Sequence, residues 1–323
     1  MLRSIRRAAL AALVLLLPGS AAASCGSEGA CPVATSESPL EARLLFDVSQ
    51  LYIDQNQPMV GSGDAAIGAI PGHHDEVRTV NRVTNFRLSY RSSAWTFGAT
   101  MPYINRTHEH IHHHQGSDIH GRWSDEGIGD LEVNVARTVT TPRGPRLRAG
   151  LGLRAPTGKQ TTVRSDAGEE LEPSARLGTG AWGLTAQFGA EWRLRAPGKS
   201  AETTMPFRIG IAGRYNGAGV EDYRHGAEAQ AHVDAEYPLV PHLALLLQSN
   251  YRVRAKNDVG AGGSEEEANT GGASIYVTPG LRFDAIPGFS IYGLAQFPVW
   301  ERVNGIQVVA ESNLVFGISR SLF

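Results

Sequence analysis

Apolar and polar residues alternate with a period of two along most of the chain. Between residues 226 and 238, for example, Glu228, Gln230 and Asp234 alternate with small or branched apolar residues. Successive side chains of a β-strand point to opposite faces of the sheet. The alternation therefore predicts strands that have one apolar and one polar face.

The same pattern predicts twelve antiparallel strands from residue 41 onward. Several of them reach or exceed the roughly 9–11 residues that a tilted strand needs to cross a lipid bilayer. The predicted strands lie near residues 41–54, 79–91, 94–106, 127–140, 146–157, 179–195, 204–217, 226–238, 241–255, 273–285, 288–300 and 307–323.

The connections between these strands alternate in length. Connections after even-numbered strands are short, and most of those after odd-numbered strands are long and polar. The long ones are residues 55–78, 107–126, 158–178 and 256–272. Outer-membrane barrels join their strands by short periplasmic turns and long external loops. An even number of strands then predicts that both termini lie in the periplasm.

The first 24 residues have the layout of a secretory signal peptide. Arg3, Arg6 and Arg7 precede an apolar run over residues 8–17, and small residues follow at 21–24. Such a run is too short for a transmembrane helix. We expect this segment to be cleaved, which leaves residues 25–40 as a short periplasmic segment before the barrel.

Both cysteines of the chain, Cys25 and Cys31, lie in this short segment. Two alternatives stay open for Cys25. Export to an oxidising compartment permits a Cys25–Cys31 disulfide. The cysteine also follows Ala-Ala-Ser, as the lipid-modified cysteine of a bacterial lipoprotein signal does.

Together these features predict an all-β fold. We expect a single-domain, transmembrane, antiparallel up-and-down β-barrel of about 12 strands over residues 41–323, surrounded by bacterial outer-membrane lipids. A soluble sandwich also shows alternation. The export signal, the loop asymmetry and aromatic residues near strand ends, such as Trp95, Tyr103 and Trp300, favour the membrane.

The end of the chain also bears on assembly. Phe323 resembles the terminal aromatic residue that the barrel-assembly machinery reads, so we expect that machinery to be a partner. Leu314, Phe316 and Ile318 are out of phase with Phe323. A β-bulge would restore the phase.

Two glycine-rich stretches resemble a known family. The first runs Gly-Ile-Gly-Asp-Leu over residues 127–131, and the second ends Pro-Thr-Gly-Lys at residues 156–159. A "GxGDL" strand followed by a strand that ends "PTGK" resembles the outer-membrane barrels named for the meta-pathway of phenol degradation. The resemblance implies a transporter and suggests aromatic or hydrophobic compounds as its solutes.

If the apolar faces meet lipid, the charged side chains gather in the lumen. Rows of guanidinium and carboxylate groups would orient polar solutes in a water-filled pore, or would pair and brace a closed interior. The predicted lining residues are Arg87, Arg148, Arg154, Arg193, Arg208, Arg214, Arg252, Arg254, Arg282, Asp130, Glu132, Glu191, Glu228, Asp234 and Glu236.

A histidine-rich segment lies in the predicted loop 107–126. Neutral imidazoles at alternating positions can bind zinc, copper or nickel. No cysteine or carboxylate framework fixes a coordination geometry, so a solvated polar loop is the competing interpretation. The candidate metal ligands are His108, His110, His112, His113 and His114.

These observations lead to a functional hypothesis. We expect a channel or transporter that passes small solutes across the outer membrane without a cofactor. The alternative is a non-conducting binding or structural barrel that captures metal through its histidines. An enzyme is not expected, since Ser249-Asn250 lacks the neighbouring histidine and glycine of a phospholipase-like site. No basic or acidic tail suggests nucleic acid as a partner.

Overall fold

A computed structural model describes residues 44–67, 75–114, 117–142, 144–168, 170–260 and 267–322. The predicted signal peptide (1–24), the predicted segment 25–40 with both cysteines, and Phe323 lie outside the described residues. No helix in the described ranges is long and apolar enough to cross a membrane.

Antiparallel strands make up most of the described chain. Two 3-10 turns, η1 (Pro173–Ala175) and η2 (Val220–Asp222), lie in the loops. The strands are β1 (Leu44–Val60), β2 (Gly63–Asp64), β3 (Asp75–Ser92), β4 (Trp95–His114), β5 (Ser117–Ile128), β6 (Leu131–Thr140), β7 (Arg146–Ala155), β8 (Gly183–Arg195), β9 (Thr204–Asn216), β10 (Glu228–Val240), β11 (Leu243–Arg254), β12 (Gly272–Ile286), β13 (Phe289–Val303) and β14 (Ile306–Leu322).

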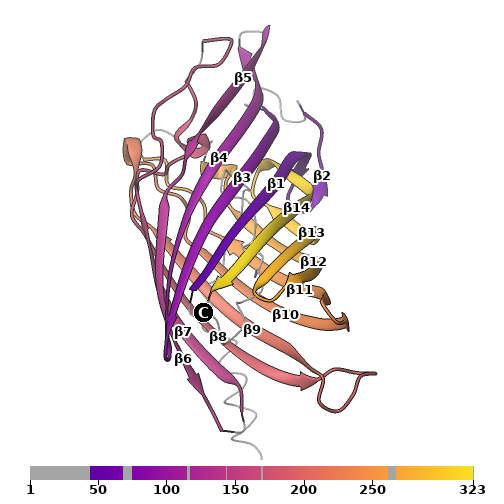
Figure 1. Ribbon diagram of the computed structural model, residues 1–323. Helices are drawn as coiled ribbons and strands as arrows, with labels where there is room; N and C mark the ends of the chain where they lie inside the picture. The colour runs from indigo at the N-terminus through magenta and orange to yellow at the C-terminus, as the bar shows by residue number, and fades with distance from the viewer. Residues whose placement is uncertain are drawn as a thin grey trace, which may run out of the picture.

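The strands close into a twelve-strand barrel (Figure 1). β14 pairs with β1 from Leu44 to Val60 and so closes the sheet. Two elements add no position to this ring. The two-residue strand β2 pairs only with the end of β1. β5 and β6 pair with successive parts of β4 and therefore share one position in the ring. The predicted antiparallel β-barrel is confirmed.

Several strands extend beyond their predicted ends. The sequence pattern places residues 107–126 in a loop, but β4 continues to His114 and pairs with β5. The predicted loop 55–78 also shrinks, and the predicted strand 127–140 is interrupted between β5 and β6. These predictions are wrong because the strands continue to pair beyond the apolar band, where pairing satisfies the backbone N–H and C=O groups. Both faces of the strands are polar there, so the sequence shows no alternation of apolar and polar residues.

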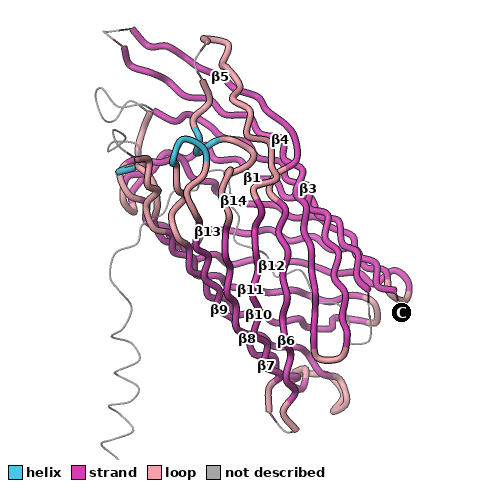
Figure 2. Tube along the Cα trace, turned by 90° about the vertical axis from the view of Figure 1, so that its left-hand side faces the viewer, coloured by secondary structure: helices cyan, strands magenta, loops and turns pink. Residues whose placement is uncertain are grey.

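The two ends of the barrel differ, as the sequence pattern predicted. One end carries the turns 93–94, 141–145, 196–203, 241–242 and 287–288, and is called the short-turn end here. The opposite, long-loop end carries the loops 156–182, 217–227 and 255–271. The C terminus lies at the short-turn end, and the 3-10 turns lie among the loops at the other (Figure 2).

The barrel is apolar outside and polar inside. Phe86, Ile211 and Phe316 are 44%, 59% and 59% exposed on the outer face. By contrast, the amides of Asn81 and Gln296 are fully buried on the inner face. A protein surrounded by water places its apolar side chains inside and its polar side chains outside. Apolar side chains outside and polar side chains inside are typical of a barrel surrounded by the hydrocarbon of a lipid bilayer. The outer surface therefore matches a barrel set in lipid.

Candidate functional site: the barrel interior and its loops

The predicted lining residues lie on strands whose alternate side chains form the outer apolar face. Arg208 and Arg214, for example, alternate with Ile209 and Ile211, which are 39% and 59% exposed. The same parity places the other predicted arginines and carboxylates of β3, β6–β8 and β10–β12 on the inner face. Asp130 lies in the short break between β5 and β6.

Most of these charges form ion pairs between strands. Arg208 donates to Glu191 at 3.2 Å and to Asp234 at 2.8 Å, and Arg146 lies 3.4 Å from Glu191. The guanidinium of Arg208 thus joins β8, β9 and β10. Four further pairs follow the wall: Arg214–Glu132 at 2.7 Å, Arg252–Glu228 at 2.5 Å, Arg282–Glu236 at 2.6 Å and Arg154–Asp130 at 3.8 Å.

The remaining predicted arginines have other surroundings. Arg254 contacts His225 and Asn257 in the loops, each at 3.2 Å. Arg87 lies in register with Asp47 of β1, and Arg193 is exposed near the short-turn end. These charged side chains therefore line the interior and also brace the barrel, because the ion-paired groups still face the lumen.

An apolar cluster on the inner wall interrupts this charged interior. Leu246, Leu294 and Val315 pack together with Tyr292, and Leu51 packs against them. The Tyr292 hydroxyl donates to Asp47 at 2.9 Å, so the polar tip of this side chain is satisfied. The interior thus combines charged side chains with an apolar strip contributed by β11, β13, β14 and β1.

The loop 156–182 is held against the wall by one buried carboxylate. Asp130 is 6% exposed and accepts hydrogen bonds from the backbone N–H of Gly158 at 2.8 Å and from that of Thr179 at 3.0 Å. The Thr179 hydroxyl donates a third bond at 2.6 Å. We call Asp130, Gly158, Gly178 and Thr179 the clasp.

Glycines let the two ends of this loop meet. A Cβ on Gly178 would lie 2.5 Å from the carbonyl carbon of Gly158 and 2.7 Å from its oxygen. Backbone atoms cannot yield to such a contact as a flexible side chain can. Lys159 continues the junction, since its backbone N–H donates to Ile128 at 2.9 Å and its ammonium pairs with Asp125.

The clasp explains the two glycine-rich stretches physically. Asp130 belongs to the first stretch, and Gly158 and Lys159 belong to the second. The Leu131 N–H also donates to the Thr157 hydroxyl at 2.9 Å. The two stretches thus join β6 to the start of the long loop.

The far part of the same loop rests on the inner face of β4. The guanidinium of Arg106 donates to the carbonyls of Ala175 and Arg176, at 2.5 and 3.1 Å, and to Asn81 at 2.6 Å. Arg106 is 3% exposed, so these bonds are shielded from water. Because the loop occupies the inside of the wall, it narrows the lumen at the long-loop end.

The other long loops join this layer. Arg176 pairs with Glu221 of loop 217–227 at 2.6 Å. Asn257 of loop 255–271 accepts from the Gly226 N–H at 2.9 Å, and its own N–H donates to the Thr270 hydroxyl at 2.9 Å. The three loops thereby form one hydrogen-bonded layer at the end of the barrel.

The predicted metal-binding histidines lie in strands and not in a loop. His108 and His110 project from β4 onto the rings of Trp123, at 5.5 and 4.2 Å between centroids. Nδ1 of His108 shares a hydrogen bond of 2.7 Å with the Thr79 hydroxyl. The side chains of His112, His113 and His114 lie outside the described set.

Within the described part of the chain, no group of three or more His, Cys, Asp or Glu side chains is placed to hold a metal ion. The ring contacts also show that His108 and His110 pack as aromatic side chains. Metal capture by the histidines of β4 stays a prediction.

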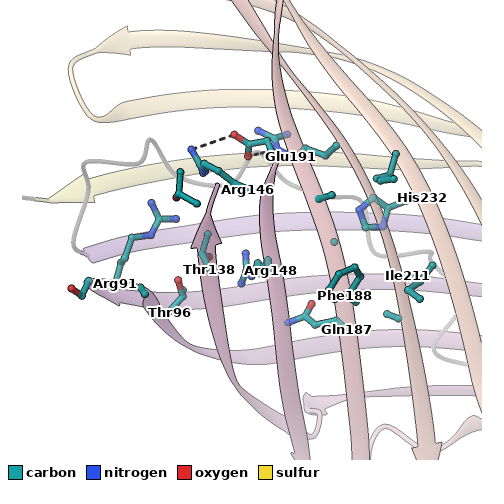
Figure 3. A pocket seen from close by; sticks show the side chains of 18 residues that line it. Arg91, Thr96, Thr138, Arg146, Arg148, Gln187, Phe188, Glu191, Ile211 and His232 are labelled. Carbon is teal, nitrogen blue, oxygen red and sulfur yellow. Dashed lines mark hydrogen bonds and ion pairs between the residues drawn. The ribbon is translucent and has the colours of Figure 1, made fainter. Parts of the chain in front are cut away.

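A cavity of about 620 Å³ opens on the inner wall toward the short-turn end (Figure 3). Strands β3, β4 and β6–β10 contribute to its lining. Four arginines, Arg91, Arg146, Arg148 and Arg208, line it with Glu191 as the sole carboxylate among its lining residues. Threonine hydroxyls, Gln187 and His232 complete the polar lining.

Two carboxyl groups at the long-loop end have raised pKa values. Burial, together with the neighbouring carboxyl group of Glu172, raises the pKa of Glu76 to about 7. Burial also raises the pKa of Glu172 in the loop, against the opposing hydrogen bond from Ser174. When loop 156–182 lies against the wall, the carboxyl group of Glu172 therefore comes close to that of Glu76.

We therefore predict that loop docking depends on pH. Raised carboxyl pKa values favour the docked loop at low pH, and this advantage is lost as the pH rises from about 4.5 through 7. Trypsin should cleave after the exposed Arg164 more slowly at pH 5.5 than at pH 8, relative to a peptide substrate. The difference should shrink in Glu76→Gln, and an unchanged pH profile in that variant would contradict the assignment.

Comparisons with known proteins support the fold. No protein-family profile matches the chain, and no curated protein sequence does. The barrel is similar to the crystal structure of the COG4313 outer membrane channel from Pseudomonas putida F1, with a TM-score of 0.62 and 13% identity over 90% of this chain and 100% of that one. The resemblance to the phenol-degradation family stays a prediction.

Two further solved structures are more distant. The NanC porin has a TM-score of 0.43 at 10% identity, covering 86% of this chain and all of that one. A Pseudomonas aeruginosa FadL homologue has a TM-score of 0.44 at 8% identity, covering 86% and 90%.

Some functional residues escaped the sequence pattern. Leu246 lies in an unbroken apolar run, where alternation cannot tell the inner from the outer face. Arg106 lay at the predicted end of a strand, and nothing in its neighbourhood marked a contact with residues 175–176. The two glycine-rich stretches were read only as a family resemblance, and nothing in them marked the contact between Asp130 and Thr179.

Proposed function

We propose that this protein is a bacterial outer-membrane channel that passes small solutes by diffusion. The observation that supports the proposal most directly is the arginine-lined cavity of about 620 Å³ inside the wall. An interior that served only to brace the barrel would fill this space with side chains. Similarity in fold to an outer membrane channel agrees with the proposal but does not identify a solute.

The orientation belongs to the same proposal. Outer-membrane barrels place short turns in the periplasm and long loops outside. The short-turn end, with both ends of the described chain, then faces the periplasm, and the loop layer faces the medium. A solute enters past loop 156–182 and leaves past the arginine-lined cavity.

In this proposal the charged and apolar side chains of the inner wall determine which solutes pass. Guanidinium groups favour solutes that carry a negative charge, and the apolar strip around Leu246 and Leu294 offers a surface for a hydrocarbon or aromatic part. Small aromatic acids satisfy both conditions. They also agree with the aromatic compounds that the sequence resemblance implies.

A liposome swelling experiment tests the proposal. Refolded protein in liposomes should admit small anionic solutes, such as benzoate, faster than neutral sugars of similar size. Empty liposomes, and liposomes that contain heat-unfolded protein, are the controls. A folded barrel that admits none of these solutes would contradict the channel and favour a closed binding or structural barrel.

A further inference from the structure

Four arginines and one carboxylate, that of Glu191, line the cavity, so positively charged side chains outnumber negatively charged ones among its lining residues. Of its four arginines, Arg146 and Arg208 share Glu191, and Arg208 also reaches Asp234. These two arginines and two carboxylates neutralise one another. Arg91 and Arg148 add two further positive charges to the same lining.

Arg91 has an unused hydrogen-bond donor inside this cavity. Its Nη1 atom is buried and has no hydrogen-bond partner among the described residues. A buried donor that lacks an acceptor is costly, so native proteins usually satisfy it with protein, water or a ligand. At this position an incoming oxyanion would supply the acceptor.

The strand register gathers further donors beside Arg91. Arg91 lies opposite Thr96 of β4, and Arg148 of β7 lies opposite Thr138 of β6. Figure 3 shows these side chains around one space, with Gln187 nearby. Guanidinium groups only donate, and hydroxyl and amide groups can donate. The wall therefore presents donors from five strands, β3, β4, β6, β7 and β8.

Two glycines lie beside Arg148 in the cavity wall. Gly189 of β8 lies opposite Arg148, and Gly210 of β9 lies opposite both Gly189 and His232. The imidazole of His232 lies over Gly210, so close that a Cβ there would be 2.5 Å from its Cε1 atom. The absence of a side chain at Gly210 therefore lets the His232 imidazole lie flat in the wall of the cavity.

We propose that the cavity between Arg91 and Arg148 is a binding subsite for the oxyanion group of a small solute, either a carboxylate or a phosphate. The guanidinium of Arg91 binds one oxygen through Nη1, and Arg148 with the threonine hydroxyls surrounds the other. This assignment deepens the proposed channel function by naming the chemical class of solute that pauses at the periplasmic end.

Direct binding tests the subsite without requiring transport. Refolded, detergent-solubilised barrel would be titrated with benzoate, acetate and inorganic phosphate in a calorimeter. Saturable binding of at least one of them is expected, and Arg91→Gln should weaken it by at least about tenfold. Benzoate without phosphate would identify a carboxylate site, and phosphate without benzoate a phosphate site.

Arg137→Gln is the matched control. Arg137 precedes Thr138 on β6, is exposed on the opposite face, and lies over the outer ring of Trp95 at 5.7 Å. This variant removes the same charge at the same height of the barrel and should leave binding unchanged. Folding of each variant is checked by the heat-dependent shift of the barrel on a gel.

The possible outcomes separate the subsite from the channel. No saturable binding, or equal binding by the wild type and Arg91→Gln, would overturn the subsite. Equal loss in Arg137→Gln would also overturn it, because binding would then follow net charge alone. A barrel that binds benzoate through Arg91 but passes no solute would retain the subsite and contradict the channel.

Discussion

Replacement of Asp130 by alanine is expected to free loop 156–182 from the wall and to raise the conductance of the barrel several-fold. The carboxylate accepts three hydrogen bonds at 2.6–3.0 Å and lies beside the buried Arg154. Each buried donor left without an acceptor costs about 1–3 kcal/mol. Loss of all three acceptor contacts should release the two ends of the loop at Gly158 and Thr179.

The barrel itself should survive this change. Its strands are joined by backbone pairing on both sides of the break between β5 and β6. Limited trypsin digestion should therefore cut the variant after Arg164 while the barrel remains folded. Asp166→Ala is the control, because this exposed carboxylate accepts only one described bond, from the Arg122 N–H at 3.0 Å. A trypsin-resistant Asp130→Ala protein with wild-type conductance would contradict the role of the clasp.

Reversal of charge at Arg208 is the second change with a large expected effect. The guanidinium lies between Glu191 and Asp234, and its side chain is only 15% exposed. Arg208→Glu places three carboxylates together. Removal of one partner from a buried ion pair costs about 3–5 kcal/mol. We expect the variant to unfold at a lower temperature in detergent and to lose preference for anions.

Compensating substitutions distinguish two roles of Arg208, which are stabilising the barrel and setting its preference for anions. Glu191→Gln and Asp234→Asn added to Arg208→Glu remove the repulsion, so stability should recover while anion preference stays low. Arg193→Glu, on the same strand as Glu191 but exposed, is the control and should change stability little. Full stability and unchanged selectivity in Arg208→Glu would show that this guanidinium neither braces nor lines the interior.

The sequence predicted the barrel because lipid imposes a simple rule. Each membrane-crossing strand needs apolar residues on one face only, so Arg208 alternates with Ile209 and reveals the inner side. Loop lengths then distinguished the two ends. Beyond the apolar band this rule no longer applies, and the extension of β4 with His108 and His110 could not be told from a loop.

The candidate site was predictable in its charges but not in its contacts. Alternation marks Arg148 and Glu191 as inward residues, yet pairing across strands depends on register, which no local pattern specifies. The clasp joins Asp130 to Thr179 across 49 positions. Such contacts arise when a loop folds back onto the wall, and the isolated loop sequence gives no sign of where it lands.

The most direct test of the channel is the electrical current through single refolded barrels in a planar bilayer with a gradient of potassium chloride. We predict discrete conductance steps and a reversal potential that shows preference for chloride, because four arginines and one carboxylate line the cavity. A folded barrel that carries no current, or one that prefers potassium, would contradict this account.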